Sequence, residues 1–106
     1  MSVNEALTDT ELDAMEKRIA ATAPAPWWAW METRHAIGGE SFIQVTPDSD
    51  EDDEIYIRRY IGGRELGSPN AQLDADIDFI ANAREDMPRL IAEVRRLRSL
   101  LAAQGG

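Results

Sequence analysis

The sequence contains no cysteine, a single histidine and no long apolar run. Without cysteine the chain has neither disulfides nor thiolate metal ligands, so secretion gains no support and a cytoplasmic location is expected. One histidine, His35, excludes a zinc site with two histidine ligands. No apolar stretch approaches the roughly 20 residues that a bilayer-spanning helix needs. The N-terminal residues also lack the basic region and apolar segment of a signal peptide. We therefore expect no metal and no membrane association.

Positive charge is scarce in this chain. It has 11 Lys and Arg residues against 20 Asp and Glu residues, which gives a formal net charge of −9. General binding to a phosphate backbone needs clustered cations, so direct nucleic-acid binding is not expected. The hydrophobic fraction of 43% and the charged fraction of 29% are ordinary for a globular protein. A length of 106 residues predicts a single domain, residues 1–106.

Recognisable catalytic groups are also missing. No Ser or Thr stands in a nucleophile motif, and no glycine run matches a phosphate-binding loop. Gly38-Gly39 and Gly62-Gly63 are turn pairs rather than ligand sites. His35 precedes the first of these pairs, and we interpret it as a surface residue rather than a catalytic base. The sequence therefore predicts a protein that is not an enzyme and has no cofactor.

The N-terminal region has the pattern of a capped helix. Thr8 and Glu11 have the spacing of a capping box, and apolar residues then recur at three and four positions through about Thr22. Pro24 and Pro26 end this helix, because proline lacks an amide donor.

The middle of the chain predicts three short strands. Alternating apolar and aromatic residues, separated by turn signals, are typical of a small antiparallel sheet. Ile43 and Val45 fall on one face of the central strand. Gly38-Gly39 is the expected first turn. The predicted strands are Trp27–Met31, Phe42–Thr46 and Ile55–Ile61.

The C-terminal third predicts a helical arm over residues 70–103. Apolar spacing indicates one helix from about Ala71 to Arg84. Asp86-Met87-Pro88 then fits the start of another, since Asp can cap a helix and proline is tolerated in a first turn. The fold class is therefore α+β: an N-terminal helix, a small three-stranded antiparallel sheet and two C-terminal helices.

The arm carries a heptad-like apolar seam. Apolar residues alternate by three and four positions, which is the spacing of a coiled coil. The seam either covers the protein's own sheet or contacts a second helix. For Leu73–Leu90 both readings stay open, whereas for residues 88–103 we favour self-association, because a short sheet cannot cover so long an arm. A homo-oligomer is expected. The predicted interface residues are Leu90, Ile91, Val94, Leu97 and Leu101.

Three tryptophans within four residues form the main candidate binding site. On a strand, Trp28 and Trp30 point to one side and Trp27 to the other, so at least one ring faces away from the core. Exposed aromatic rings beside Arg58 and Tyr60 would stack on a base or another planar ligand. The alternative is that the tryptophans only fill a small core. The candidate ligand-binding residues are Trp27, Trp30, Arg58 and Tyr60.

A dense acidic run follows the second predicted strand. Its first three aspartates match the ligand spacing of an EF-hand loop, but Asp53 stands where that loop requires Gly, and Arg59 where it requires Glu. The run is therefore interpreted as a solvated loop, or alternatively as a mimic of nucleic-acid phosphates that occupies a basic groove on another protein. The acidic residues are Asp48, Asp50, Glu51, Asp52, Asp53 and Glu54.

Three segments together resemble a known group of sequences. Pro24-Ala25-Pro26-Trp27 is similar to the Thr-Pro-Gly-Pro-Trp element of small uncharacterised proteins of actinobacteria and their phages, with Ala23 and Ala25 where the family has Thr and Gly. Residues 76–81 resemble that family's Asn/Asp-Ala-x-Phe-Ile-Ala element. Residues 86–97 resemble its Asp-Val-Pro-x-Leu-Leu-x-Glu-Val ending. The resemblance implies a phage or prophage accessory protein, located in the host cytoplasm if phage-encoded, and implies no particular activity.

Two functions are consistent with these patterns. The first is a non-enzymatic accessory protein of phage type, an oligomer that binds a host protein or sequesters a small, nucleotide-like ligand. The second is an acidic inhibitor or nucleic-acid mimic that acts through the carboxylates of residues 48–54.

Overall fold

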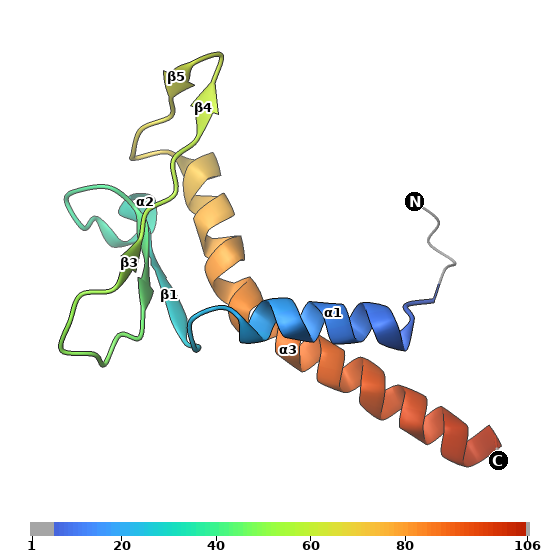
Figure 1. The fold of residues 1–106 in the computed structure, drawn as a ribbon. Helices are drawn as coiled ribbons and strands as arrows, with labels where there is room; N and C mark the ends of the chain where they lie inside the picture. The colour runs from blue at the N-terminus through green and yellow to red at the C-terminus, as the bar shows by residue number, and fades with distance from the viewer. Residues whose placement is uncertain (1–5, 106) are drawn as a thin grey trace. The chain divides into compact units, whose positions relative to one another are not determined.

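The computed structural model describes residues 6–105, which form a mixed α+β fold (Figure 1). An N-terminal helix, α1 (Asp9–Ala20), precedes a three-stranded antiparallel sheet, and the chain ends in a long helix, α3 (Ala71–Gly105). This arrangement confirms the predicted fold class, the N-terminal helix and the small sheet. No helix among these residues is long and apolar enough to cross a bilayer.

The chain packs as two compact units. The helical unit combines the N-terminal segment to Ala23 with the residues from Met87 onward, and the sheet unit comprises Pro24–Asp86. Helix α3 contributes its first half to the sheet unit and its second half to the helical unit. That the whole chain folds as one domain stays a prediction.

The sheet unit is built on strands β1 (Trp27–Trp30), β2 (Phe42–Val45) and β3 (Glu54–Ile55), in the order β1-β2-β3. All neighbours are antiparallel. The register places Trp27 opposite Val45 and Trp30 opposite Phe42. A short helix, α2 (Glu32–His35), lies between β1 and β2, so these strands are not joined by the tight hairpin that Gly38-Gly39 led us to expect.

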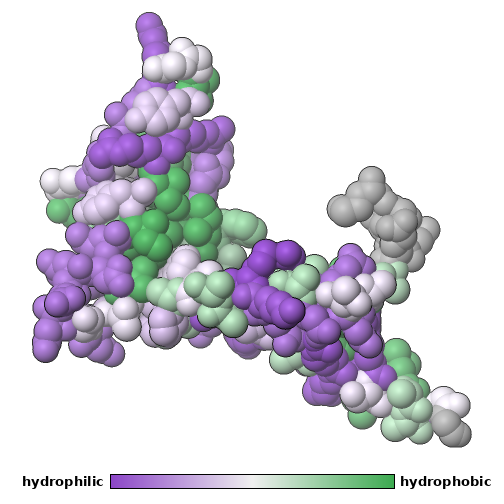
Figure 2. Space-filling model, in the orientation of Figure 1, coloured by the Kyte–Doolittle hydropathy of each residue, from purple (hydrophilic) through white to green (hydrophobic). Residues whose placement is uncertain are grey.

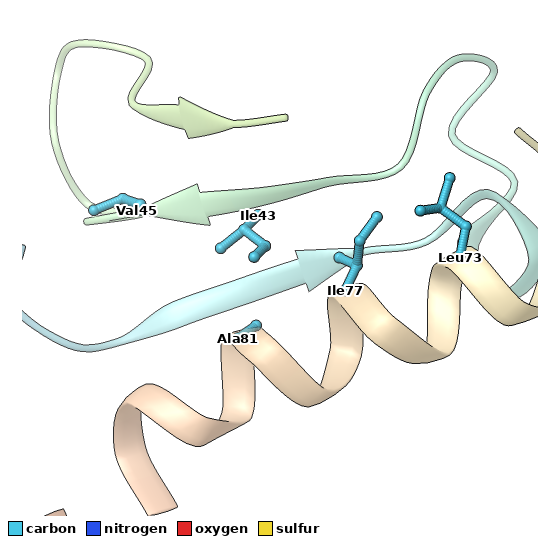
Figure 3. Close-up of a cluster of buried hydrophobic side chains, with 5 residues drawn as sticks. All are labelled: Ile43, Val45, Leu73, Ile77 and Ala81. Carbon is cyan, nitrogen blue, oxygen red and sulfur yellow. The ribbon is translucent and has the colours of Figure 1, made fainter. Parts of the chain in front are cut away.

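The core of this unit lies between β2 and the first half of α3 (Figure 3). Ile43 and Val45 share one face of β2, as predicted, and both are almost completely buried. Leu73, Ile77 and Ala81 recur every four residues on α3, which places them on one side of the helix facing the strand. Apolar residues at every second position of β2 thus pack against apolar residues at every fourth position of α3, and together they form one apolar layer.

The third predicted strand is much shorter than expected. Only Glu54 and Ile55 pair with β2, and residues 56–59 are not in a strand. The chain instead forms a separate hairpin from β4 (Tyr60–Ile61) and β5 (Arg64–Glu65). Gly62 and Gly63 both have positive φ values, of 56° and 80°. A two-residue turn with positive φ at both positions matches the strand twist of a hairpin, and glycine adopts it without steric cost.

The helical unit joins α1 to the second half of α3. The Thr8–Glu11 capping box is confirmed: the Glu11 amide donates to Thr8 Oγ1 at 3.0 Å, and Glu11 Oε1 accepts from the Thr8 amide at 3.0 Å. Leu12 and Ile91 are the buried apolar residues here. Arg95 on α3 binds two carboxylates of α1, at 2.9 Å from Asp13 and 2.7 Å from Glu16.

The two C-terminal helices of the prediction are one continuous helix in the structure. Helix α3 runs through Pro88 without a break, although proline inside a helix removes one backbone hydrogen bond and costs about 3 kcal/mol or more. Packing on both sides of Pro88 gives a physical reason. Ile77 and Ala81 before it are buried in the sheet unit, and Ile91 after it is buried in the helical unit, so both halves are held in helical conformation.

Candidate functional site

A pocket of about 350 Å³ lies in the sheet unit beside strand β1 and helix α2, and we name it the tryptophan pocket. Strand β1, helix α2 and the middle of the first half of α3 all contribute to its lining. Its lining residues are Trp27, Trp28, Ala29, Trp30, Met31, Arg34, His35, Asp78 and Asn82.

Strand alternation divides the three tryptophans. Trp27 and Ala29 pack against the apolar core, whereas Trp28 and Trp30 lie together on the other side of β1. The centroids of these two rings are 6.4 Å apart and their planes are inclined by 57°. Trp28 is 52% exposed. Trp27 therefore belongs to the core and Trp28 to the surface, so each of the two interpretations of the tryptophan cluster holds for part of it.

The Trp30 ring is fixed from two sides. Its Nε1 donates to Gln44 Oε1 on the neighbouring strand at 2.8 Å. It also packs edge-to-face with the His35 ring, at a centroid distance of 5.3 Å and an interplanar angle of 65°. Edge-to-face packing of this kind is the favoured geometry for aromatic pairs. Trp30 therefore gives the pocket a rigid wall, beside which Trp28 has an open face.

A hydrogen bond from the backbone fixes the tautomer of the neutral His35 ring. The Met31 amide donates to His35 Nδ1 at 3.0 Å. A nitrogen that accepts a hydrogen bond carries no proton, so in the neutral ring the proton lies on Nε2, which becomes a donor. His35 ends helix α2, and Ala36 follows it in the left-handed region at φ 49°.

Helix α2 is held in place by the buried carboxylate of Asp74. Oδ2 of Asp74 accepts hydrogen bonds from the amide and the hydroxyl of Thr33, at 3.0 and 2.6 Å. Oδ1 accepts from the Ser41 hydroxyl at 2.5 Å, and Ser41 Oγ in turn accepts from the Glu32 amide at 2.9 Å. These bonds join α3, α2 and the segment before β2. They fix the helix that carries Arg34 and His35.

The pKa of Asp74 reflects this environment. Burial by itself raises the pKa of the carboxyl, because it disfavours the charged form. The hydrogen bonds from Ser41 and Thr33, with a smaller contribution from the positive charge of Arg34, outweigh burial and lower the pKa below its ordinary value. The carboxylate is therefore the form that the folded structure stabilises.

Helix α3 supplies the other polar wall of the pocket. Asp78 and Asn82 are four residues apart and so lie on one face of the helix. Asn82 Nδ2 donates to the Asp78 carbonyl oxygen at 2.9 Å and to Asp78 Oδ1 at 3.0 Å. This arrangement leaves Asp78 Oδ2 and the Asn82 side-chain oxygen as acceptors.

Arg58 and Tyr60, two of the four predicted ligand-binding residues, are not among the residues that line this pocket. Arg58 binds Glu65 at 2.5 Å and Glu40 at 3.5 Å. These carboxylates, above all the hydrogen bond to Glu65, raise the pKa of the guanidinium. Tyr60 belongs to the β4–β5 hairpin and is 59% exposed. Trp27 and Trp30 therefore both line the pocket, whereas the predicted Arg and Tyr partners lie outside it.

Sequence reasoning missed the polar residues of the pocket. Arg34 and His35 lie on α2, which no periodicity predicted because the helix is only one turn long. Asp78 and Asn82 had a detectable signal, the four-residue spacing of polar residues on a predicted helix, but nothing in the sequence indicated that this face meets β1.

Most of the predicted interface residues are exposed along the second half of α3. Leu90, Leu97 and Leu101 are 60%, 46% and 68% exposed, and Figure 2 shows hydrophobic atoms at the surface near the C-terminal end. Val94 is half-buried. Ile91 departs from the expectation. It is buried and lines a groove with Ile19 and Ala20 of α1, so it belongs to the core of its own chain.

The acidic run is an exposed loop between β2 and β3. Every residue from Asp48 to Glu54 is exposed. The Asp53 carbonyl oxygen accepts from the Val45 amide at 2.8 Å, which ties the end of the loop to the sheet. Within residues 6–105, no group of three or more carboxylate or histidine side chains is arranged to hold a metal ion.

Comparison of the chain with protein-family models, with curated proteins and with solved structures found no match.

Proposed function

We propose that this chain is a non-enzymatic accessory protein of phage type that captures a small, nucleotide-like ligand with a planar ring in the tryptophan pocket. The observation that supports this most directly is the pair Trp28 and Trp30, on the side of β1 away from the core, with Trp28 52% exposed. Leaving a tryptophan face in water forgoes the apolar burial that a small domain needs. A ligand that stacks on the Trp28 ring would bury this apolar surface.

The size and lining of the pocket support binding of a small molecule. Its volume of about 350 Å³ lies at the lower end of the range of about 300 to 1,000 Å³ for ligand sites. Aromatic rings with a few convergent polar groups are the usual lining of such sites. Stacking of a base on an aromatic side chain contributes about 1 to 3 kcal/mol.

The lining favours binding over catalysis. The residues around the pocket include no serine, threonine, lysine or cysteine that would act as a nucleophile. The single histidine has Nδ1 occupied by a backbone amide rather than by a carboxylate that would orient it as a general base.

A panel of nucleosides and nucleotides, measured by thermal shift, tests the proposal. A ligand that binds only the folded state raises the melting temperature by mass action. We expect a shift that Trp28→Ala removes and that Arg58→Ala, outside the pocket, leaves unchanged. The absence of a shift with every member of the panel would overturn the proposal.

Self-association through α3 is the second part of the proposed function. Leu90, Leu97 and Leu101 are exposed and lie seven and four residues apart, with the half-buried Val94 completing the alternation of four and three. An apolar stripe of this kind is uncommon on a monomer. A second copy of the same helix would cover it. Light scattering at micromolar concentration should give an oligomer mass that Leu97→Glu with Leu101→Glu reduces to the monomer. Ala103→Glu, at an exposed position outside the seam, is the matched control.

The acidic loop supports a second candidate function, mimicry of nucleic acid. Its six carboxylates are exposed over seven residues, which is the accessibility that binding to a basic groove requires. Replacing all six acids by Asn and Gln would abolish mimicry of this kind and spare ligand capture in the tryptophan pocket. Trp28→Ala would have the reverse effect.

A further inference from the structure

We propose that the tryptophan pocket has a donor end and an acceptor end, and that it therefore selects a nucleoside monophosphate whose base carries an exocyclic amino group. This inference rests on the proposed function and names the ligand class of the same site. Three features carry it: two donors on α2, two acceptors on α3 and an aromatic surface that lies with them in one pocket.

The donor end is formed by consecutive residues of α2. Arg34 lines the pocket, and within residues 6–105 its guanidinium forms neither a hydrogen bond nor a salt bridge, although its positive charge acts on the Asp74 carboxylate. Arg58, Arg59 and Arg95, in contrast, bind carboxylates. His35 adds a second donor, because its Nδ1 accepts from the Met31 amide, which leaves Nε2 as the nitrogen that donates. A phosphate group has three acceptor oxygens and suits this pair of donors.

The acceptor end is formed by α3. Asn82 uses its amide nitrogen on Asp78, so its own side-chain oxygen and Asp78 Oδ2 remain as acceptors. Adenine, cytosine and guanine each carry an exocyclic amino donor, whereas uracil has a carbonyl oxygen at the position of the cytosine amino group. Carboxylate and amide side chains recognise such amino groups in proteins. An oxygen in place of the amino group would face the negative charge of Asp78.

The two ends are held by separate parts of the sheet unit. Asp74 fixes α2 through Thr33 and Ser41, and the buried residues Leu73 and Ile77 fix α3. Selection does not then depend on rearrangement of the pocket, because donors and acceptors are already positioned before a ligand binds.

The charge of the chain explains why both ends matter. A net charge of −9 repels free phosphate, so Arg34 alone would hold a small anion weakly. Stacking on Trp28 and the amino contact to Asp78 supply the remaining binding energy. The pocket should therefore bind the combination of ring, amino group and phosphate, and inorganic phosphate by itself poorly.

Quenching of tryptophan fluorescence by AMP, adenosine and IMP tests both ends in the unmodified chain. Adenosine lacks the phosphate, and IMP has a ring carbonyl in place of the adenine amino group. One charge-assisted hydrogen bond contributes about 1.5 kcal/mol or more, so we expect each of these two ligands to bind about ten-fold more weakly than AMP. Inorganic phosphate should neither quench nor compete at the same concentration.

Two substitutions assign the ends to residues. In Arg34→Gln, AMP should bind no better than adenosine, while its preference over IMP remains. In Asp78→Asn, the preference for AMP over IMP should be lost, while the preference over adenosine remains. Arg64→Gln removes a positive charge from the β4–β5 hairpin of the same unit, outside the pocket, and should change neither ratio.

The outcomes separate this inference from the proposed function. Equal affinities for AMP, adenosine and IMP would overturn the two-ended pocket and leave ring capture standing. Binding of AMP that survives Trp28→Ala would place the nucleotide outside the pocket and overturn the inference. If none of the ligands quenches the fluorescence or shifts the melting temperature, both the inference and the proposed function fail.

Discussion

The sheet unit and the helical unit are stabilised in different ways. The sheet unit buries Ile43 and Ile77 completely and adds a carboxylate, Asp74, whose hydrogen bonds are all internal. Among the described residues of the helical unit, Leu12 and Ile91 are the buried apolar ones, and the salt bridges of Arg95 to Asp13 and Glu16 are exposed. The comparison indicates that the helix–sheet layer is held by more complete burial than the helix pair. The following predictions test that contrast.

The largest effect is expected from removing the same side chain in each unit. Ile77→Ala should reduce the free energy of unfolding by about 4 kcal/mol, because a fully enclosed cavity is left behind. Ile91→Ala should cost about 2 kcal/mol, since Ile91 lines a groove of about 390 Å³ with Ile19 and Ala20, and the neighbouring side chains have room to relax. Urea denaturation followed by circular dichroism measures both. Equal losses would contradict the contrast.

Asp74→Asn should have the next largest effect. The amide keeps the shape of the carboxyl group but loses its charge and one acceptor atom. We expect a loss of about 2 kcal/mol, the contribution of hydrogen bonds to a buried charged group. Because α2 is then less firmly held, ligand binding by Arg34 and His35 should weaken as well. Asp76→Asn, two residues further along α3, removes the charge of a carboxylate that is 39% exposed and pairs with Arg59, and it is the control for the removal of a charge.

The stability of the sheet unit should also depend on acid pH. The pKa of Asp74 is lower in the folded state than in the unfolded chain, so the unfolded state binds a proton first as the pH falls. The stabilisation is complete above about pH 5 and is lost progressively below about pH 4. Unfolding curves between pH 7 and pH 3 should show this loss in the unmodified chain. The same loss in Asp74→Asn would assign it to other carboxylates.

The smallest effect is expected from the salt bridges of the helical unit. Arg95→Ala removes the contacts to Asp13 and Glu16, but all three side chains are more than a third exposed. Exposed ion pairs contribute little and are screened by salt. Melting temperatures in low and high salt should differ slightly between the two proteins at low salt and coincide at high salt. A large loss at both salt concentrations would show that Arg95 acts through packing of its aliphatic chain.

Local signals in the sequence were sufficient for several elements. The Thr8–Glu11 capping box, the strand with Ile43 and Val45 on one face, and the α+β class follow from spacing and turn residues alone. Each depends on contacts between near neighbours, or on a simple alternation of apolar residues. Because these features depend on residues a few positions apart, they can be predicted without knowing which distant segments pack together.

Other expectations needed the tertiary structure. The sequence divided the C-terminal arm at Pro88, but packing on both sides of it keeps α3 continuous. It assigned Arg58 to the tryptophans, whereas Glu65 and Glu40 hold that side chain elsewhere. In both cases, contacts between residues far apart in the sequence outweighed a correct local preference.

The amino-acid sequence by itself determined what this chain lacks, where its first helix begins, and that at least one tryptophan must face away from the core. Only the tertiary structure decided that Trp28 and Trp30 lie on that side and that Trp28 is the more exposed of the two. It also decided that Arg34, His35, Asp78 and Asn82 would share a pocket with them, because α2 and α3 are brought to β1 by burial of Ile77 and by the hydrogen bonds of Asp74. The pocket depends on packing between segments far apart in the sequence, so the spacing of residues along the chain does not predict it.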